Sequence, residues 1–561
     1  MLLKDLINDF VPRHDYTLEK LVAYLFLGYV RLENNLSINE IGTFINEMDS
    51  QRVGSFLYSR FNETDYEKFD NEIVQKANKE SIVNEIIYLD SSLDVCGVRG
   101  GLLSEYEPVP ESVVQLGLKA VEPSTVNSAI NFCCGIGSNI IRMADMGIKN
   151  ITGVEIHSVS AAISEIRTKL YKIKNAGYQI RIINSSVFGY SEENMEEKYD
   201  LVTVQMPWGV KGLGEQLATW RTDFLRYVTV GKSSDWYFLI LAMQHISSKG
   251  KAIAIVPESI EYVYPDREIR RSFVKEGYIE KVIQLPTNLL QYTSISSLLL
   301  VLSFGNSEIE FTNASNSYSE KGRIRYFLTE DIERILSSEN PYRRVVNTER
   351  VLAEERLLPS YYGVSKIEVS IALGDVAQIT RGQNYLRKDL DPIVSEFFTN
   401  YQLVRTSHLE DGLICGREYL VELPEKFEEL MDEDILITRV SSSKSIAIYN
   451  EEDEEKAVAD QSLLIVRVDK EKINPYYLLA YFMSDLGKEQ LHVAYSGTSI
   501  LQISIANLKK VRIPVLDKYE QEKIAKSIKE KLEDIRMKKV QLSLLLEERD
   551  EDVNIWFSGV N

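Results

Sequence analysis

The chain has 561 residues, 44% of them hydrophobic, which is enough for about three soluble domains with separate cores. Its formal net charge of −20 and pI near 5.0 argue against a protein that coats nucleic acid by bulk attraction, but they do not exclude local basic grooves. The four cysteines show neither a disulfide framework nor metal-ligand spacing, so we expect catalysis without a metal.

The first 95 residues are predicted to form a helical domain. Apolar residues recur at helical spacing in residues 18–30, 38–48 and 53–61. The longest apolar run, residues 21–30, is about half the length of a bilayer span, and no basic secretory region precedes it. We therefore expect a buried helix in a cytoplasmic protein that does not contact a membrane.

A loop rich in proline and glycine follows at residues 100–114. Pro108 and Pro110 exclude a helix there and favour a turn. With Tyr106 and Val109-Pro110, the segment resembles a loop of the adenine methyltransferases of type I restriction-modification systems. That resemblance implies that Tyr106 and Pro110 pack over the methionine end of S-adenosylmethionine.

Two glycines close the first predicted strand. The apolar residues 129–132 lead to Gly135 and Gly137, and a second short strand ends at Glu155, as in the first β-α-β unit of a Rossmann-like sheet. Ile140 replaces the third glycine of the dinucleotide fingerprint, and no phosphate-binding Gly-Lys-Ser/Thr follows. S-adenosylmethionine is the remaining common cofactor, and the alternative is a turn without a ligand.

The segment Asn131-Phe132-Cys133-Cys134-Gly135-Ile136-Gly137 resembles the Asp-Pro-x-Cys-Gly-x-Gly motif of DNA adenine methyltransferases. The resemblance implies that Asn131 meets the methionine ammonium, that Cys133, Gly135 and Gly137 form the turn, and that Glu155 holds the ribose. After the third predicted strand, residues 179–184, these enzymes carry an Asp that contacts adenine. This chain has Asn184-Ser185, whose side chains can still form neutral hydrogen bonds, and we assign the position to Ser185.

A fourth strand, residues 199–204, runs into Gln205-Met206-Pro207-Trp208, where amino-methyltransferases carry Asn/Asp-Pro-Pro-aromatic. A flipped adenine needs an aromatic face and carbonyl acceptors for its amino group. Gln205 would supply the side-chain carbonyl, Pro207 a rigid turn and Trp208 the stacking face. The alternative is an aromatic-capped strand end without catalysis.

The next segments continue the α/β pattern. We predict helices that begin near residues 234 and 269, and strands at 250–257, 279–286 and 297–303, the last of which closes the sheet. The series resembles the modification subunit of type I restriction-modification systems from about residue 96 through the Leu-x-Pro-Ser-x-Tyr segment that ends at Tyr362. We therefore expect a methyltransferase domain at 96–310 and a connector at 311–364.

Residues 365–516 change character and are rich in short predicted strands. They resemble one target-recognition domain of a type I specificity subunit, which implies an α+β domain that reads base edges in double-stranded DNA. The acidic block 451–455 should turn to solvent. The expected DNA contacts are Arg381, Gln383, Arg387, Lys388, Arg439 and Lys444.

The last segment, residues 517–561, is predicted to be a long spacer or dimerisation helix with an apolar stripe. Specificity subunits use two such helices as a ruler between half-sites, so a homodimer, or related specificity and modification subunits, is one hypothesis. A separate restriction subunit could join them. The alternative is a helix folded back on its own domain. The stripe consists of Ile524, Ile528, Leu532, Ile535, Leu542 and Leu545.

Two functions compete. The first is a sequence-specific DNA N6-adenine methyltransferase that uses S-adenosylmethionine. The second is a catalytically degenerate recognition or scaffold subunit of a defence complex, suggested by the departures at Asn131, Ser185 and Gln205-Met206. A small-molecule methyltransferase or an RNA enzyme would leave residues 365–516 without a task.

Overall fold

The structure is a computed structural model in which the chain separates into two compact units, 1–363 and 364–561. Among the described residues, no helix combines the length and apolar character that a bilayer span requires. The described residues are 3–14, 16–92, 106, 109–122, 126–211, 213, 217, 220, 222, 224, 233–261, 263–290, 293–321, 324–363, 369–384, 392–416, 418–423, 428–440, 445–451, 455–496 and 502–557.

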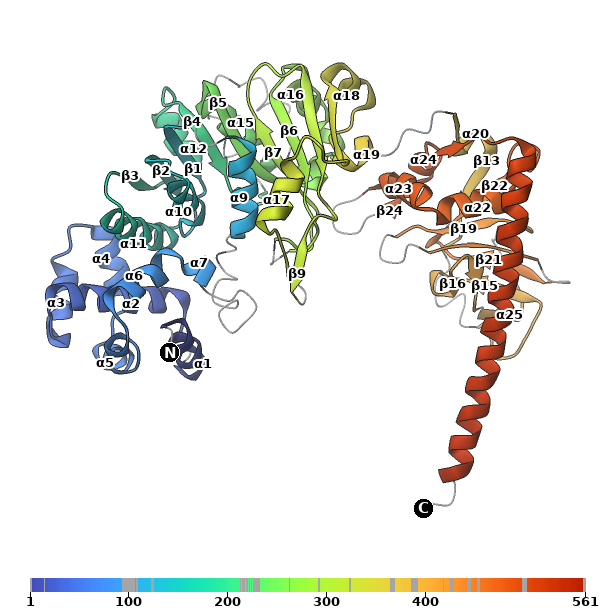
Figure 1. Cartoon of the computed structure of the whole chain (residues 1–561), viewed down its shortest axis with the longest axis horizontal. Helices are drawn as coiled ribbons and strands as arrows, with labels where there is room; N and C mark the ends of the chain where they lie inside the picture. Colours follow the sequence, from blue (N-terminus) through green and yellow to red (C-terminus); the bar gives the residue numbers. More distant parts are fainter. Residues whose placement is uncertain are drawn as a thin grey trace. The chain divides into compact units, whose positions relative to one another are not determined.

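The first unit begins with a group of helices (Figure 1). The central one, α2 (Leu18–Asn34), starts where the Thr17 side chain accepts a hydrogen bond from the Lys20 N–H, and it ends at Asn35 in the left-handed region. Its residues 21–30 are all buried, which confirms the predicted buried helix. The other helices are α1 (Leu3–His14), α3 (Ile41–Asn46), α4 (Gln51–Tyr58), α5 (Glu63–Glu72), α6 (Lys79–Ile87) and α7 (Leu89–Ser92).

In the described residues, a nine-stranded sheet forms the centre of this unit, in the order β11-β8-β6-β7-β5-β4-β1-β2-β3. The run β5-β4-β1-β2-β3 is parallel throughout, which confirms the predicted Rossmann-like sheet. The strands are β1 (Ser128–Phe132), β2 (Asn150–Glu155), β3 (Gln179–Asn184), β4 (Tyr199–Val204), β5 (Ile246–Pro257), β6 (Ile279–Gln284), β7 (Ser297–Leu302), β8 (Glu308–Asn313) and β11 (Arg343–Asn347).

The prediction that residues 297–303 close the sheet is wrong. Strand β7 lies between β5 and β6 and is antiparallel to both. Two later strands extend the sheet beyond β6, because β8 pairs with β6 and β11 pairs with β8. A run as apolar as Ser297–Leu302, buried along its whole length, is typical of an interior strand, and its order along the chain does not reveal its place in the sheet.

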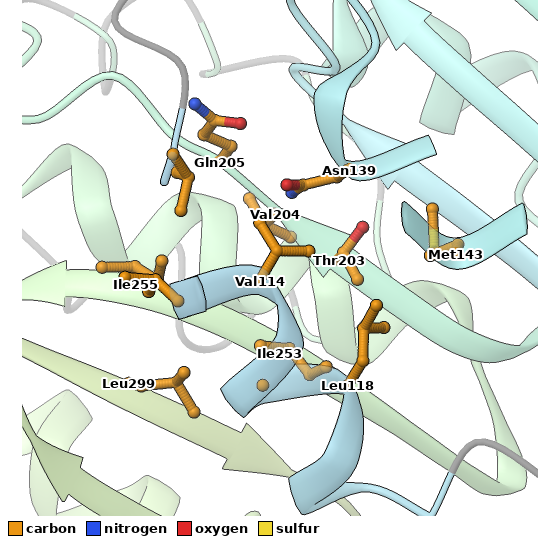
Figure 2. Close-up of a pocket in the computed structure, with 13 residues that line it drawn as sticks. Val114, Leu118, Asn139, Met143, Thr203, Val204, Gln205, Ile253, Ile255 and Leu299 are labelled. Atoms are coloured by element: carbon orange, nitrogen blue, oxygen red, sulfur yellow. The ribbon is translucent and has the colours of Figure 1, made fainter. Parts of the chain in front are cut away.

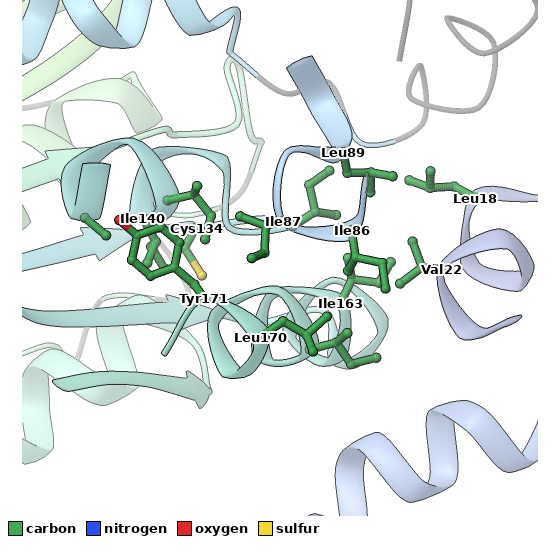
Figure 3. Packing of buried hydrophobic residues seen from close by; sticks show 14 of the residues in the cluster. Leu18, Val22, Ile86, Ile87, Leu89, Cys134, Ile140, Ile163, Leu170 and Tyr171 are labelled. Carbon is green, nitrogen blue, oxygen red and sulfur yellow. The ribbon is translucent and has the colours of Figure 1, made fainter. Parts of the chain in front are cut away.

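Helices cover both faces of the sheet. One apolar cluster joins one face to the N-terminal helices, and Figure 3 shows Ile86 beside Ile163, with Leu18 near Leu89. The second cluster fills the opposite face. The first face carries α9 (Glu111–Ala120), α10 (Ser138–Asp145), α11 (Ser158–Lys174) and α17 (Thr329–Leu336), and the second carries α12 (Val187–Glu193), α15 (Ser234–His245), α16 (Arg267–Lys275), α18 (Thr348–Glu354) and α19 (Pro359–Gly363).

In the residues that the structure describes, the second unit is an α+β body built on two four-stranded sheets. The first sheet is β13 (Ala377–Arg381), β22 (Leu463–Val468), β19 (Ile435–Thr438) and β20 (Ile446–Ile448). The second is β14 (Val394–Ser395), β18 (Glu418–Leu420), β15 (Tyr401–Val404) and β21 (Lys456–Ala459). Three further strand pairs are β12 (Ser370–Ala372) with β25 (Arg512–Pro514), β16 (Leu409–Glu410) with β17 (Leu413–Ile414), and β23 (Tyr495–Ser496) with β24 (Gln502–Ile503).

This unit ends in the long helix α25 (Lys518–Phe557). Its first part packs on α22 (Pro475–Met483) and the core, where Leu532 is 4% exposed. Its later part extends away from this body (Figure 1). There Val540, Leu542 and Leu545 are each more than half exposed. The helix therefore folds back on its own domain over its first part only. Among its described residues the unit also contains the shorter helices α20 (Leu373–Val376), α23 (Asp485–Ala494) and α24 (Ile505–Leu508).

Candidate functional site

The candidate site lies where the parallel part of the sheet reverses its strand order. Strand β1 pairs with β2 on one side and with β4 on the other. Open α/β sheets bind ligands at the carboxyl ends of the strands on either side of such a point. Here the segment after β1 is the two-glycine turn, residues 133–137, and the segment after β4 is residues 205–209, which we call the corner.

The two-glycine turn requires its glycines. Gly135 and Gly137 have φ values of 54° and 88°, and the non-glycine Cys133 shares this left-handed region with φ of 55°. A Cβ atom on Gly137 would lie 2.6 Å from the Ser164 hydroxyl of α11. The turn is therefore packed directly against that helix.

Glu155 fixes the turn from the end of β2. One carboxylate oxygen accepts the Gly135 N–H at 2.8 Å, and the other accepts the His157 N–H at 2.8 Å. The residue is only 5% exposed, so its carboxylate is buried and held by two backbone donors. Each oxygen keeps a lone pair that can accept a further hydrogen bond, for example from a hydroxyl group.

Asn131 is the most deeply buried polar residue of the turn region, with no exposed surface. Its Nδ2 donates to the Thr203 carbonyl of β4 at 3.2 Å, which sets the orientation of the amide. Its Oδ1 has no hydrogen-bond partner among the described residues. A buried acceptor without a donor is costly, so this atom is a candidate ligand contact.

The two adjacent cysteines are buried thiols. Burial, together with the Glu155 carboxylate, raises the pKa of Cys133 to about 12 and raises the pKa of Cys134 still further above its usual value. Both therefore stay protonated at neutral pH. Among the described residues, no group of three or more His, Cys, Asp or Glu side chains is placed to hold a metal ion.

At the end of β3, Asn184 and Ser185 differ in availability. The Asn184 amide donates to the Glu155 and Ile156 carbonyls at 2.8 and 2.9 Å, so both of its N–H groups are used within the protein. The Ser185 hydroxyl donates to the neighbouring Ser186 carbonyl at 3.2 Å, which is a weak local bond. Ile156, which the sequence analysis did not single out, is 63% exposed directly after Glu155. An apolar residue in that place could cover the flat face of a ring.

The corner begins beside the turn. The Gln205 N–H donates to the Phe132 carbonyl at 3.3 Å, which joins the first corner residue to the last residue of β1. Pro207 is exposed, and Trp208 is half-buried against the second apolar cluster. The Trp208 indole Nε1 donates to the Ile255 carbonyl of β5 at 3.1 Å, so the ring is held in one orientation.

A pocket lies between the corner and α9. Figure 2 shows the polar ends of Asn139, Thr203 and Gln205 at a pocket that is otherwise lined by aliphatic side chains such as Val114 and Ile253. The Asn139 Oδ1 and Thr203 Oγ1 atoms have no partner among the described residues. Unpaired buried oxygens therefore gather around the ends of β1 and β4.

Part of the loop that contains Pro108 and Pro110 lies at this pocket. Pro110 caps α9, and its neighbour Val109 lines the same pocket as Gln205. The hydroxyl of Tyr106 instead donates to the Glu19 carboxylate of α2. The structure thus places Val109, the neighbour of Pro110, at the pocket beside the corner and attaches Tyr106 to α2.

Asp235, at the start of α15, was not assigned a role from the sequence. It is 5% exposed, its Oδ1 atom has no partner among the described residues, and the Gly209 N–H lies close enough to favour its ionised form. Burial, with a contribution from the nearby Asp266, raises the pKa of Asp235 to about 6. An Asp at the start of a predicted helix is usual in any protein, so the sequence carries no signal for this placement.

In the second unit, burial and the positive charge of Arg381 lower the pKa of Arg439. The effect of one charge on the other indicates that the two side chains lie near each other. Arg381 donates to the Gln461 carbonyl at 3.0 Å, and Arg439 donates to the Gln502 side chain. Gln383, two residues after the end of β13, forms an isolated parallel β-bridge with Asp460. The other predicted contacts, Arg387, Lys388 and Lys444, lie outside the described residues.

The prediction for the acidic block is wrong for Glu455. Glu451 is exposed, but Glu455 is 5% exposed and directly precedes β21. A strand that continues into the core draws its neighbour inward, which a run of like charges does not reveal. Residues 452–454 lie outside the described residues.

Comparisons with known families divide the chain into two matches. Residues 106–375 match the family N-6 DNA Methylase, and residues 367–548 match the family Type I restriction modification DNA specificity domain. The two matches together extend from the loop before α9 into the last helix.

Two curated relatives are methylase subunits. The chain is 20% identical over 339 residues to the type I restriction enzyme MpnII methylase subunit of Mycoplasma pneumoniae, covering 54% of this chain and 62% of that protein. It is 23% identical over 331 residues to the type I restriction enzyme MjaVIII methylase subunit of Methanocaldococcus jannaschii, covering 54% and 56%. The chain therefore spans about three fifths of the length of these relatives.

A solved structure with partial likeness is the type I restriction-modification system methyltransferase subunit from Streptococcus thermophilus. Its TM-score is 0.45 at 16% sequence identity, and the match covers 58% of this chain and 77% of that one.

Proposed function

Because the chain joins a domain of the N-6 DNA methylase family to a type I restriction modification DNA specificity domain, we propose that it is a sequence-specific DNA N6-adenine methyltransferase. The observation that carries this proposal is the hydrogen bond from Gln205 to Phe132. It joins the proposed base-binding corner directly to the proposed cofactor turn, as a transfer between two bound ligands requires.

The residues of the turn fit S-adenosylmethionine, which would supply an electrophilic methyl group. The unpaired Asn131 Oδ1 would accept a hydrogen bond from the methionine ammonium, and the Glu155 carboxylate would accept the ribose hydroxyls. Gly137 has no room for a side chain because a Cβ atom there would clash with Ser164 of α11. Ile156 and Ser185 would meet the adenine ring of the cofactor.

The replacement of the expected Asp by Asn131 is one argument for a catalytically degenerate protein, and the hydrogen bonds of Asn131 weaken that argument. An Asp at this position could not donate to the Thr203 carbonyl, whereas the Asn amide does so and keeps its oxygen free. The cost of replacing the charge is the difference between a charge-assisted and a neutral hydrogen bond, about 1 kcal/mol. That difference weakens cofactor binding about fivefold and does not abolish it.

The corner would receive the flipped adenine. Trp208, held by its bond to Ile255, would stack on the base, and the Gln205 side-chain carbonyl would accept a hydrogen bond from its N6 amino group. Pro207 would limit the conformations of the loop between them. The amine loses its proton after transfer, so no separate general base is needed.

The second unit would supply DNA recognition. Arg381, Gln383 and Arg439, with Arg387, Lys388 and Lys444, are proposed to contact double-stranded DNA. The exposed apolar residues of α25 between Val540 and Leu546 suit a partner helix, either from a second copy or from a related specificity or modification subunit. A restriction subunit would be a further partner.

Calorimetry of the full chain with S-adenosylmethionine tests the cofactor assignment. We expect one binding site, and the absence of detectable heat at millimolar cofactor would favour the scaffold function.

Sequencing that detects modified bases tests the transfer. DNA from cells expressing the wild type should carry N6-methyladenine at one motif, and DNA from cells expressing Trp208→Ala should lack it. Unmodified DNA in both samples would reject the transferase function.

A further inference from the structure

Arg167 of α11 is a fully buried arginine that the proposed mechanism does not use. Its guanidinium contacts two distant parts of the chain. Nη1 donates to the Ile136 carbonyl at 2.8 Å, inside the two-glycine turn. Nε and Nη2 donate to the Ile87 carbonyl at 3.0 and 2.8 Å, at the end of α6 in the N-terminal helical region.

Asp90 of α7 neutralises this guanidinium. Its carboxylate accepts a hydrogen bond from Arg167 Nη2, and its side chain is 6% exposed. Burial alone would raise the pKa of Asp90, but the charges of Arg167 and Arg142 and the hydrogen bonds to the carboxylate together more than offset this, so the pKa lies below its usual value. Both members of the pair are therefore charged, and removing either leaves the other buried without compensation.

Helix α11 contacts the turn at two points one helical turn apart. Ser164 packs against the α-carbon of Gly137, and Arg167 binds the carbonyl of Ile136. The two contacts restrict the turn in addition to Glu155, which holds the N–H of Gly135. The conformation of the turn thus depends on where α11 and its arginine lie.

We propose that Arg167 is a positioning residue for the cofactor turn and that the N-terminal helical region, through Asp90 and the Ile87 carbonyl, controls cofactor affinity. This inference rests on the proposed function, because it takes the turn to bind S-adenosylmethionine. Its consequence is that a displacement of the N-terminal helices would loosen the turn and release the cofactor.

An arginine is needed in this place. Its planar group presents five donors in a fixed arrangement, so it can bind the Ile87 and Ile136 carbonyls and the Asp90 carboxylate together. A lysine has the charge but a single nitrogen, which cannot reach both carbonyls in the same geometry. Arg167→Lys should therefore keep the charge balance with Asp90 and lose the connection to the turn.

The test measures cofactor affinity and thermal stability in the full-length chain. We expect Arg167→Lys and Asp90→Asn to weaken S-adenosylmethionine binding at least about tenfold, by loss of a charge-assisted bond. KM for the cofactor should rise in parallel, while kcat at saturating cofactor stays within about threefold. Wild-type affinity in both folded variants would overturn the inference.

Two control variants separate positioning from general destabilisation. Asp70 is fully buried and accepts two hydrogen bonds from Arg31 within the same helical region, far along the chain from the turn. Glu165 of α11 pairs with Arg52 of α4, which is a second contact between α11 and the N-terminal helices. Asp70→Asn and Glu165→Gln should lower the melting temperature and leave cofactor affinity within about twofold. An equal loss of affinity in the controls would also overturn the inference.

A measurement on the wild type does not depend on any variant folding. Hydrogen exchange of the full chain with and without S-adenosylmethionine should show slower exchange at residues 79–90 when the cofactor is bound. Protection of the two-glycine turn without protection of residues 79–90 would overturn the inference and leave the proposed function intact. Failure of the wild type to bind S-adenosylmethionine would instead reject the proposed function.

Discussion

The two halves of the candidate site differ in exposure, because Glu155 beside the turn is buried whereas Pro207 and Gly209 of the corner are exposed. In the two-glycine turn, the Gly135 N–H is bound by Glu155, the Gly137 N–H by the Cys134 carbonyl at 2.9 Å, and the Ile136 carbonyl by Arg167. In the corner, the described contacts include the Gln205 N–H with the Phe132 carbonyl, the Trp208 indole with the Ile255 carbonyl and the Gly209 N–H with Asp235.

This difference indicates that the protein's own hydrogen bonds fix the proposed cofactor turn and that the proposed base-binding corner is more exposed. A preorganised turn suits a small cofactor that binds first and tightly. An accessible corner suits a base that must enter from a duplex. Changes to the turn should therefore alter cofactor affinity, and changes to the corner should alter the rate of transfer.

The largest effect is expected at Glu155. Glu155→Ala removes the proposed partner of the ribose hydroxyls and leaves the Gly135 and His157 N–H groups without an acceptor. Loss of charge-assisted bonds should weaken S-adenosylmethionine binding by about 100-fold or more, measured by calorimetry. A change below threefold would break the distinction between the two halves.

The substitution Trp208→Ala should affect the corner and lower the rate of methyl transfer. Loss of base stacking, worth about 1–3 kcal/mol, should lower the rate constant of methyl transfer roughly 10- to 100-fold in a single-turnover assay. Cofactor affinity should stay near wild type. Trp208→Phe keeps a stacking face but not the bond to Ile255, so its rate should lie between the two. A loss of cofactor affinity without a loss of rate would contradict this assignment.

Asp235 predicts a pH dependence confined to the corner. Its pKa of about 6 means that, as pH falls from 7 to 5, the carboxylate is protonated and its hydrogen bond from the Gly209 N–H loses its charge assistance. The transfer rate should fall about tenfold over this range, and cofactor affinity should not change. In Asp235→Asn this component of the rate profile should be absent.

Stability should change with pH in the opposite direction. Because folding raises the pKa of Asp235, its contribution to the free energy of unfolding is present below pH 4 and is lost as pH rises through 6. The difference amounts to about 3 kcal/mol at most. Denaturant unfolding of wild type and Asp235→Asn between pH 4 and 7 measures it, and parallel curves would contradict the assignment.

The smallest effect is expected at Gly135. A Cβ atom there meets no heavy atom within 4 Å, so Gly135→Ala carries only the backbone strain of its φ of 54°, about 1 kcal/mol. Cofactor affinity should fall about fivefold. Gly137→Ala adds a clash with Ser164 and should weaken binding more. Equal effects would show that the turn adapts more readily than its hydrogen bonds indicate.

Much of the first unit could be predicted from the sequence, because its signals are local. Strands β3 and β4 begin and end at the predicted residues, since alternation and flanking polar residues define them. The glycine pair and Glu155 also revealed a turn and its carboxylate. These features depend on residues close together in the chain.

The strand order of the sheet and the residues that support the two-glycine turn depend on contacts between residues far apart in the chain, which the sequence does not reveal. The insertion of β7 between β5 and β6, and the extension of the sheet by β11, follow from pairing that residue patterns do not encode. Arg167 and Asp90 are 77 residues apart, and each resembles an ordinary surface charge in the sequence. Asn131 was expected to be a weakened Asp, and only its bond to Thr203 explains why an amide suits that position.

The raised pKa values of Cys133 and Cys134 bear on how the protein tolerates oxidation. Thiolates, not thiols, react with peroxides and alkylating reagents, so both residues should react slowly while the chain is folded. Unfolding would restore ordinary thiol acidity at these two positions. Their rate of modification by iodoacetamide, followed by mass spectrometry, could therefore report local opening of the turn without an added label.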